Sequence, residues 1–186
     1  ISANTNVEFI CNQIDKYQKL EEISGKLKCI AFCTNIAHAE IMAEEFNNFG
    51  YSSISLTGAN NLGQRVKSFN DLQDDNNELE IICTVDILNE GVDIPAINMV
   101  LFLRPTESST IFLQQLGRGL RKYKDKKYVI VLDFIGNNYD RSIQIAMALG
   151  TLGKSTIIEK AYLKEMVNSN FKELNIPGVS VYIDEL

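Results

Sequence analysis

Short apolar runs alternate with segments of helical periodicity along the first two thirds of the chain. Apolar residues recur at helical spacing within residues 7–17, 39–49 and 62–72. Nearly continuous apolar runs predict strands that are buried on both faces, at residues 28–33, 52–56, 80–84, 97–103 and 127–132. Strands that alternate with helices predict an α/β fold with a parallel sheet and right-handed crossovers.

The chain has a different pattern after the last predicted strand. Residues 140–152 carry a further helical pattern, and a longer helix is predicted from Lys154 to about Leu174, before Pro177-Gly178 and an apolar tail. We therefore predict one domain over residues 1–150 and a helical extension over residues 151–186. The extension is expected to pack on that domain or on a neighbour outside this chain.

Polar loops follow the predicted strands at their carboxyl ends. They contain Thr34-Asn35, Thr57-Gly58, residues 84–95 and residues 104–109. Thr34-Asn35 also offers an N-cap to the helix that follows. In parallel α/β sheets, ligands bind beside the loops at the carboxyl ends of the strands. A binding site is therefore expected at this edge of the sheet.

The stretch from Gln114 to Arg121 has the most specific pattern in the chain. As a helix it would place Gln114, Gly117, Arg118 and Arg121 on one face and its leucines on the opposite face. Two arginines one turn apart suit a phosphate, because guanidinium keeps its charge and its planar fork matches phosphate oxygens. Taken alone, the stretch fits an ordinary solvated basic face equally well.

A second candidate stretch runs from Thr84 to Pro95. A strand ends, a polar loop continues to Gly91, and Asp93 stands two residues before the proline. The Thr84 hydroxyl could contact a phosphate, and Asp93 could accept a hydrogen bond from a sugar hydroxyl. Taken alone, this stretch is also compatible with a capped connection to the next strand.

Composition narrows the class of protein. The 186 residues are 45% hydrophobic, which suffices for a buried core. No apolar run approaches the ~18 residues of a membrane span, and the start of the chain lacks the regions of a signal peptide, so a cytoplasmic location is predicted. The net charge of -6 argues against a self-sufficient nucleic-acid binder. A local phosphate-binding edge, completed by another domain, remains compatible with this charge.

Cysteine and histidine usage predicts neither disulfides nor a metal site. The four cysteines show no Cys-x-x-Cys spacing and stand in apolar surroundings, which predicts reduced, buried thiols. His38 is the only histidine, so a zinc site is not expected.

The two candidate stretches together resemble motifs V and VI of superfamily 2 helicases. Motif V ends in Gly-x-Asp-x-Pro and motif VI has the form Gln-x-x-Gly-Arg-x-x-Arg. The residues that match are, in the expected order, Gly91, Asp93, Pro95, Gln114, Gly117, Arg118 and Arg121. Asn89-Glu90 and residues 133–137 are most similar to bacterial DEAD/DEAH-type DNA helicases related to the type III restriction subunit. The resemblance covers residues 5–150 and implies a three-layer RecA-like fold of the P-loop NTPase type, with helices on both faces of the sheet.

This resemblance implies ATP hydrolysis in a cleft between two RecA-like domains. The first domain would carry the phosphate loop and hold most of the Mg²⁺ contacts. The second domain, which this chain resembles, would supply Arg118 and Arg121 as catalytic arginine fingers. Its implied nucleotide-binding residues are Gly91, Asp93 and Gln114.

The resemblance also implies contacts with the nucleic-acid backbone from the loops at the sheet edge. The residues at the corresponding positions are Thr34, Asn35, Thr57, Gly58, Arg65 and Thr84. One departure concerns motif V, where many family members have threonine immediately before the aspartate. Here Val85 precedes Asp86, and the threonine is one position earlier, at Thr84.

No phosphate loop or acidic box accompanies these motifs. Gly153-Lys154-Ser155 lacks the glycine that a phosphate loop needs five residues earlier, where Ala148 stands, so this chain alone is predicted not to hydrolyse ATP. We therefore predict a monomeric second motor domain of an ATP-dependent DNA helicase or translocase. Its expected partners are DNA, favoured over RNA by the subfamily resemblance, and the first RecA-like domain of the same chain. The alternative is a non-catalytic RecA-like scaffold that binds a partner.

Overall fold

The fold is described by a computed structural model. It describes residues 3–20, 25–85, 94–104, 126, 129–134, 174–176 and 179–181. The chain divides into two compact units, one formed by Ile1–Pro105 with Gln115–Ile135 and the other by Thr106–Gln114 with Gly136–Leu186.

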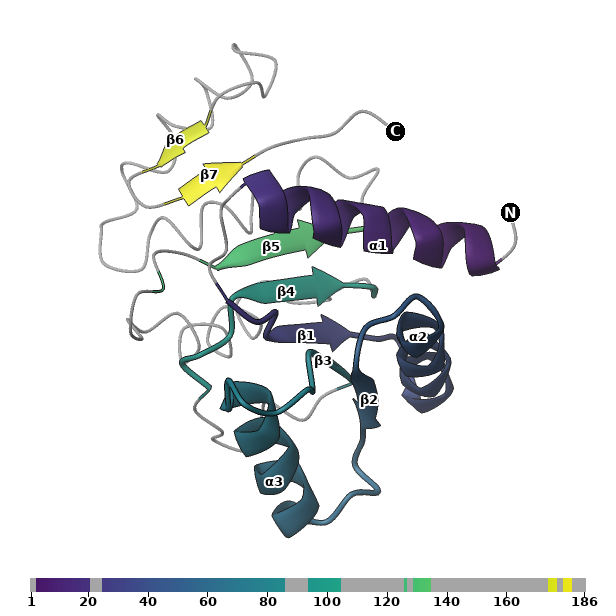
Figure 1. Ribbon diagram of the computed structural model, residues 1–186. Helices are drawn as coiled ribbons and strands as arrows, with labels where there is room; N and C mark the ends of the chain where they lie inside the picture. The colour runs from purple at the N-terminus through teal and green to yellow at the C-terminus, as the bar shows by residue number, and fades with distance from the viewer. Residues whose placement is uncertain are drawn as a thin grey trace, which may run out of the picture. The chain divides into compact units, whose positions relative to one another are not determined.

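A five-stranded parallel sheet forms the centre of the first unit (Figure 1). Its strand order is β2-β3-β1-β4-β5, and every neighbouring pair is parallel. The strands are β1 (Cys29–Phe32), β2 (Ser53–Leu56), β3 (Ile81–Thr84), β4 (Met99–Phe102) and β5 (Ile130–Asp133). The predicted α/β fold with a parallel sheet is confirmed.

Burial explains why the apolar runs become strands. All four residues of β1, β3 and β4 are buried, whereas β2 and β5 at the two edges of the sheet each include two partly exposed residues. Strands covered on both faces need apolar side chains at every position. The continuous runs in the sequence are therefore the signature of the central strands.

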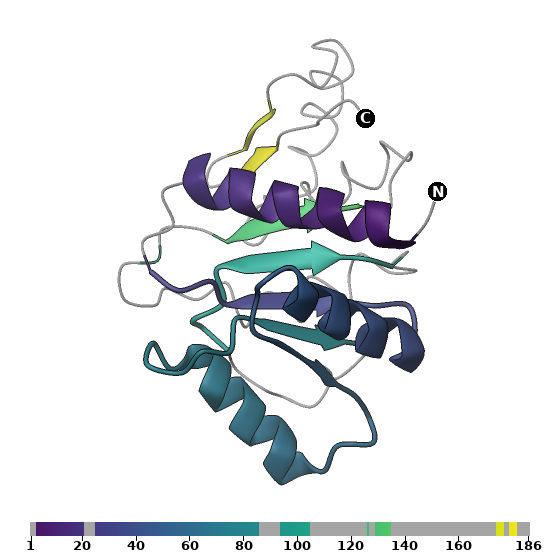
Figure 2. The same ribbon diagram turned by 45° about the vertical axis from the view of Figure 1, so that its right-hand side comes forward.

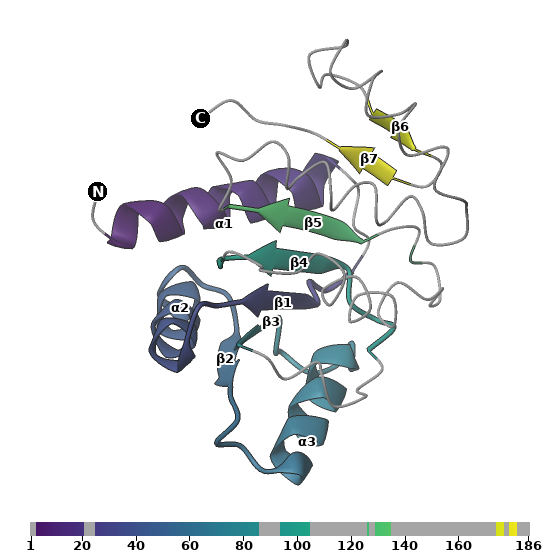
Figure 3. The same cartoon turned by 180° about the vertical axis from the view of Figure 1, so that it is seen from behind.

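Helices α1 (Ala3–Leu20) and α2 (Ile36–Asn48) share one face of the sheet (Figure 2). One core cluster joins Ile14 of α1 and Phe46 of α2 to Ala31 of β1. Seen from behind, β5 lies in front of α1 (Figure 3). One core of the first unit therefore lies between these two helices and this side of the sheet.

Helix α3 (Leu62–Gln73) belongs to the other face. Its buried Phe69 and Leu72 lie outside the α1–α2 cluster, as do Ile30 and Phe32, which alternate with the cluster residues along β1. The chain moves outward from β1 to β2 and returns inward to β3, so two right-handed crossovers place α2 and α3 on opposite faces.

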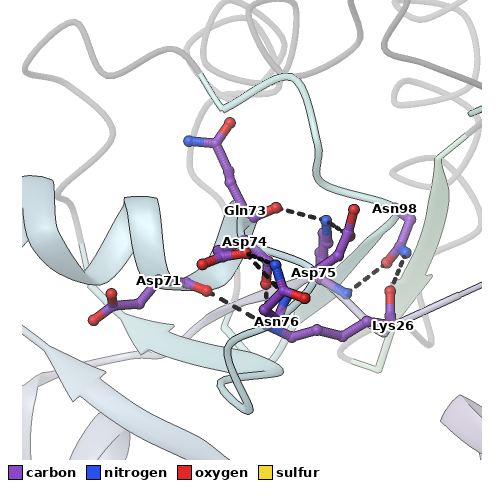
Figure 4. A network of polar contacts seen from close by, with 8 residues as sticks. Lys26, Asp71, Gln73, Asp74, Asp75, Asn76 and Asn98 are labelled. Carbon is purple, nitrogen blue, oxygen red and sulfur yellow. Dashed lines mark hydrogen bonds and ion pairs between the residues drawn. The ribbon is translucent and has the colours of Figure 1, made fainter.

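Lysines anchor the carboxyl end of α3 at the amino edge of the sheet (Figure 4). The Lys28 ammonium donates to the Gln73 carbonyl (2.7 Å) and to the Asp75 carboxylate, and the Lys26 ammonium donates to the Asp74 carbonyl (3.0 Å). The last carbonyls of a helix lack intrahelical donors and lie at the negative end of its dipole, so cations stabilise them. The side chain of Lys28 is only 6% exposed.

Asn98 extends this anchor to the start of β4. Its side-chain oxygen accepts from the Lys28 backbone N–H (2.8 Å), and its side-chain nitrogen donates to the Lys26 carbonyl (2.9 Å). The end of α3 and the segments that precede β1 and β4 are thereby joined in one hydrogen-bonded network.

The second unit contains an antiparallel strand pair near the carboxyl end of the sequence. Strand β6 (Leu174–Ile176) pairs with β7 (Val179–Val181), with Ile176 opposite Val179. The predicted helix to about Leu174 is therefore wrong at its end, where β6 begins, and the predicted apolar tail includes β7. The β-branched side chains of these strands favour an extended backbone. The predicted helix over 140–152 and the part of the predicted Lys154–Leu174 helix that precedes β6 lie outside the described residues, and the division at residue 150 stays a prediction.

None of the helices that the structure describes is both long enough and apolar enough to cross a membrane.

Candidate functional site

Three adjacent strands end at the part of the sheet edge where the sequence predicts a nucleic-acid site. Strand β3 lies between β1 and β2, and its last residue, Thr84, is in register with Phe32 on one side and Leu56 on the other. Parallel neighbours lie about 4.8 Å apart, so the three strand ends span roughly 10 Å. The structure thus brings Thr84 together with the loops that begin at Cys33 and Thr57.

The loop between β1 and α2 exposes Thr34 and Asn35. Asn35 is the N-cap of α2, and its side-chain oxygen accepts from the His38 backbone N–H (2.9 Å). The backbone N–H of Thr34 donates to His38 Nδ1 (3.2 Å), and the Thr34 hydroxyl lies 3.2 Å from the same nitrogen. The predicted site residue Asn35 therefore also determines where α2 begins.

His38 is a supporting residue to which the sequence analysis assigns no role in this loop. Its only signal in the sequence is the spacing of four residues from Thr34, which stands one position before the N-cap of α2. Because Nδ1 faces the Thr34 N–H donor, the arrangement suits a neutral ring that is protonated on Nε2. Burial lowers the pKa of His38.

A pH titration of His38 should have its midpoint below the ordinary histidine value of about 6.5. Because the pKa of His38 is lower in the folded state, the unfolded chain binds more protons than the folded chain as the pH drops below about 6.5. The contribution of His38 to stability is therefore complete above about pH 6.5 and falls as the pH drops towards the folded pKa. The ring protons of this single histidine can be followed by NMR, with His38→Gln to assign them. A midpoint above the ordinary value would contradict this arrangement.

The loop between β2 and α3 is closed by its own polar groups. Asn60 accepts the Thr57 backbone N–H at its side-chain oxygen (2.8 Å) and donates its own N–H to the Thr57 carbonyl (3.1 Å). Thr57 itself is buried, and its hydroxyl accepts from the Ala59 N–H (3.3 Å). Gly58 is exposed. Of the two predicted residues Thr57 and Gly58, therefore, only the glycine is presented to solvent.

Helix α3 begins directly after this loop with a capping box. Asn61 accepts the Gln64 backbone N–H (2.9 Å), and the Gln64 side chain accepts the Asn61 N–H (2.9 Å). One turn into the helix, Arg65 directs its guanidinium back at the loop and donates to the carbonyls of Asn60 (2.9 Å) and Gly58 (3.1 Å). Arg65 therefore lies at the predicted edge, with part of its hydrogen-bonding capacity used within the protein.

Thr84 is fully buried, with 0% of its surface exposed. Within the part of the chain that the structure describes, its hydroxyl has no hydrogen-bond partner. It stands beside Phe32, whose ring stacks on that of Phe102 (centroids 5.6 Å apart, planes at 13°) and lies 6.0 Å from the Arg104 guanidinium. A contact between Thr84 and a nucleic acid would require this side chain to be uncovered, so its role stays a prediction.

The implied ATP-site residues lie outside the described residues. This applies to the nucleotide-binding Gly91, Asp93 and Gln114 and to the catalytic Arg118 and Arg121. Their roles stay predictions. Among the residues that are described, no three histidine, cysteine or acidic side chains are grouped so that they could hold a metal ion.

All four cysteines are buried free thiols, as predicted. Burial raises the pKa of Cys29, and burial together with the nearby Asp15 carboxylate raises that of Cys11 to about 11. The thiols of Cys11 and Cys29 are therefore protonated core groups with little thiolate character.

The comparison with protein families matches the helicase conserved C-terminal domain to residues 9–123. The putative ATP-dependent helicase IRC3 of Saccharomyces cerevisiae is 31% identical over 58% of this chain and 15% of its own length. The pre-mRNA-splicing ATP-dependent RNA helicase PRP28 of Chaetomium globosum is 26% identical over 73% of this chain and 19% of its own length.

Among solved structures, the ATP-dependent type ISP restriction-modification enzyme LlaBIII bound to DNA is similar to this chain with a TM-score of 0.53. It is 25% identical, and the match covers 67% of this chain and 10% of the enzyme. The chain therefore spans less than a fifth of each of these three proteins.

Proposed function

Since the chain belongs to the helicase conserved C-terminal domain family of superfamily 2, we propose that it is the second motor domain of an ATP-dependent DNA helicase or translocase. The observation that supports this role is the pair of polar loops that follow β1 and β2, on either side of the carboxyl end of β3. In this proposal the loops hold the nucleic-acid backbone, and the motif VI arginines act on ATP that is bound by a first domain.

The edge offers donors that suit phosphate oxygens without a strongly basic surface. Gly58 is exposed and offers its backbone N–H, and Thr34 is exposed with its hydroxyl 3.2 Å from His38 Nδ1. The first N–H groups of α2 and α3 lack intrahelical partners by helix geometry, and both helices begin at this edge. Hydroxyls, backbone N–H groups and helix N-termini are common phosphate ligands. Neutral donors of this kind agree with the net charge of -6.

The proposed ATP chemistry requires a second domain. ATP hydrolysis would supply the free energy for movement along the nucleic acid. Arg118 and Arg121 would present their fixed positive charges to the phosphate tail, while Asp93 and Gln114 would help to hold the nucleotide. Because this chain covers only a small part of its relatives, the activity of the whole protein is part of the proposal.

DNA is the proposed nucleic acid. The similar restriction-modification enzyme is bound to DNA, whereas PRP28 is an RNA helicase of comparable identity to this chain. The choice of DNA over RNA therefore rests on the similarity to the restriction-modification enzyme, and it can be tested directly.

The ATPase rate of the full-length protein should rise when DNA is added and should rise less with RNA of the same sequence. The measurement is phosphate release at saturating ATP over a range of nucleic-acid concentrations. Stronger stimulation by RNA would contradict the assignment to DNA alone. A rate that responds to neither polymer would contradict the motor and favour the partner-binding scaffold.

A further inference from the structure

Arg65 lies at the predicted edge of the sheet, but its guanidinium is turned towards the protein's own loop. Its Nε donates to the Asn60 carbonyl (2.9 Å) and its Nη2 to the Gly58 carbonyl (3.1 Å). Both acceptors belong to the backbone of the loop between β2 and α3. The planar fork of a guanidinium can satisfy two carbonyls in a fixed geometry, whereas an ammonium is a single point charge.

The loop to which Arg65 donates has one backbone N–H that points outward, that of Gly58. The Thr57 carbonyl accepts the Asn60 N–H (3.1 Å) and therefore points into the turn. In a trans peptide the N–H of the next residue points the opposite way, so the Gly58 N–H is directed out of the turn. Gly58 is exposed, and no acceptor for this N–H exists within the described ranges.

We propose that Arg65 is a positioning residue, which shapes the Thr57–Asn61 loop so that its outward donor meets a nucleic-acid phosphate. Arg65 acts through the carbonyls of Gly58 and Asn60 and does not itself bind the phosphate. This role rests on the proposed function of the sheet edge. Arg65 and Asn60 both stabilise this loop. Arg65 donates to its carbonyls from α3, and the Asn60 side chain bonds to Thr57 within the turn.

Hydrogen exchange tests the effect of Arg65 on the loop without nucleic acid. In the full-length protein, Arg65→Gln and Arg65→Lys should both increase the exchange of the backbone amides in residues 57–61. The matched control is Lys67→Gln, because Lys67 is a cation on the same helix whose side chain is 80% exposed and pairs only with Asp71 among the described residues. Exchange that stays at the wild-type rate in both Arg65 variants would overturn the proposal.

The salt dependence of DNA binding separates positioning from direct phosphate contact. Loss of a phosphate contact lowers the slope of log affinity against log salt by about 0.9. We expect Arg65→Gln, Arg65→Lys and the charge-neutral Asn60→Ala each to weaken DNA binding by roughly tenfold and to leave this slope unchanged. A lower slope in Arg65→Gln, with wild-type affinity in Arg65→Lys, would show direct contact and overturn the proposal.

The wild-type measurement distinguishes failure of this inference from failure of the proposed function. If the full-length wild-type protein does not bind DNA, the proposed function of the edge is wrong, and the role of Arg65 is overturned with it. If the wild type binds DNA and the Arg65 variants bind equally well, the proposed function stands and the positioning role alone is overturned.

Discussion

Arg121→Ala in the full-length protein should lower the DNA-stimulated ATPase rate by about 10³–10⁵-fold, the range found for arginine fingers in other phosphoryl-transfer enzymes. The proposed role of Arg121 is to place a permanent positive charge against the phosphate tail of ATP as negative charge moves onto it. Alanine removes that charge, and no other residue type reproduces the planar fork. The rate is measured as phosphate release at saturating ATP and DNA.

A matched control separates this effect from a general loss of basic charge. Lys124→Ala removes a nearby cation from a position without an assigned role, and its ATPase rate should stay within about twofold of wild type, since charges outside such a site have small effects. Far-ultraviolet circular dichroism should be unchanged in both variants. Wild-type turnover in Arg121→Ala would refute the arginine-finger assignment.

Phe32→Ala should lower the free energy of unfolding by about 3–5 kcal/mol, the usual cost of truncating a buried phenylalanine. Phe32 is 2% exposed on the central strand β1 and stacks on Phe102 of β4. Removal of its ring leaves a cavity beneath the edge that carries Thr84. Urea unfolding of the 186-residue chain, followed by circular dichroism, measures the change.

Phe49→Ala provides the comparison for the stability measurement. Phe49 is also a phenylalanine, but it is 43% exposed at the end of α2. Its truncation should cost less than about 1 kcal/mol, because a side chain that stays largely in water loses little on removal. Equal losses in the two variants would contradict the placement of Phe32 in the core.

The sheet could be predicted because its central strands are covered on both faces. Full burial leaves continuous apolar runs such as residues 29–32 and 81–83, and these runs are visible without any tertiary information. The start of α2 could be predicted for a local reason, since Asn35 caps the helix through a hydrogen bond to a residue three positions later. Both features depend on short-range rules.

The directions of the site side chains could not be predicted. Arg65 turns towards two carbonyls whose orientation depends on the dihedral angles of the preceding loop, and the burial of Thr84 depends on neighbours from other strands. The strand pair β6–β7 was missed because each strand has only three residues, too few to show a period of two within a predicted helix and tail.

The lysine network at the opposite edge has a mechanical consequence for a motor. If DNA pulls on the loop at Gly58, the force passes along α3 to its carboxyl end. There, Lys26 and Lys28 donate hydrogen bonds to the last carbonyls of the helix. Because the Lys28 side chain is only 6% exposed, dissolved salt screens it weakly. In the proposed motor, high salt should therefore release DNA from the loop before it releases α3 from the sheet, and α3 would act as a rigid connection between the DNA and the rest of the domain.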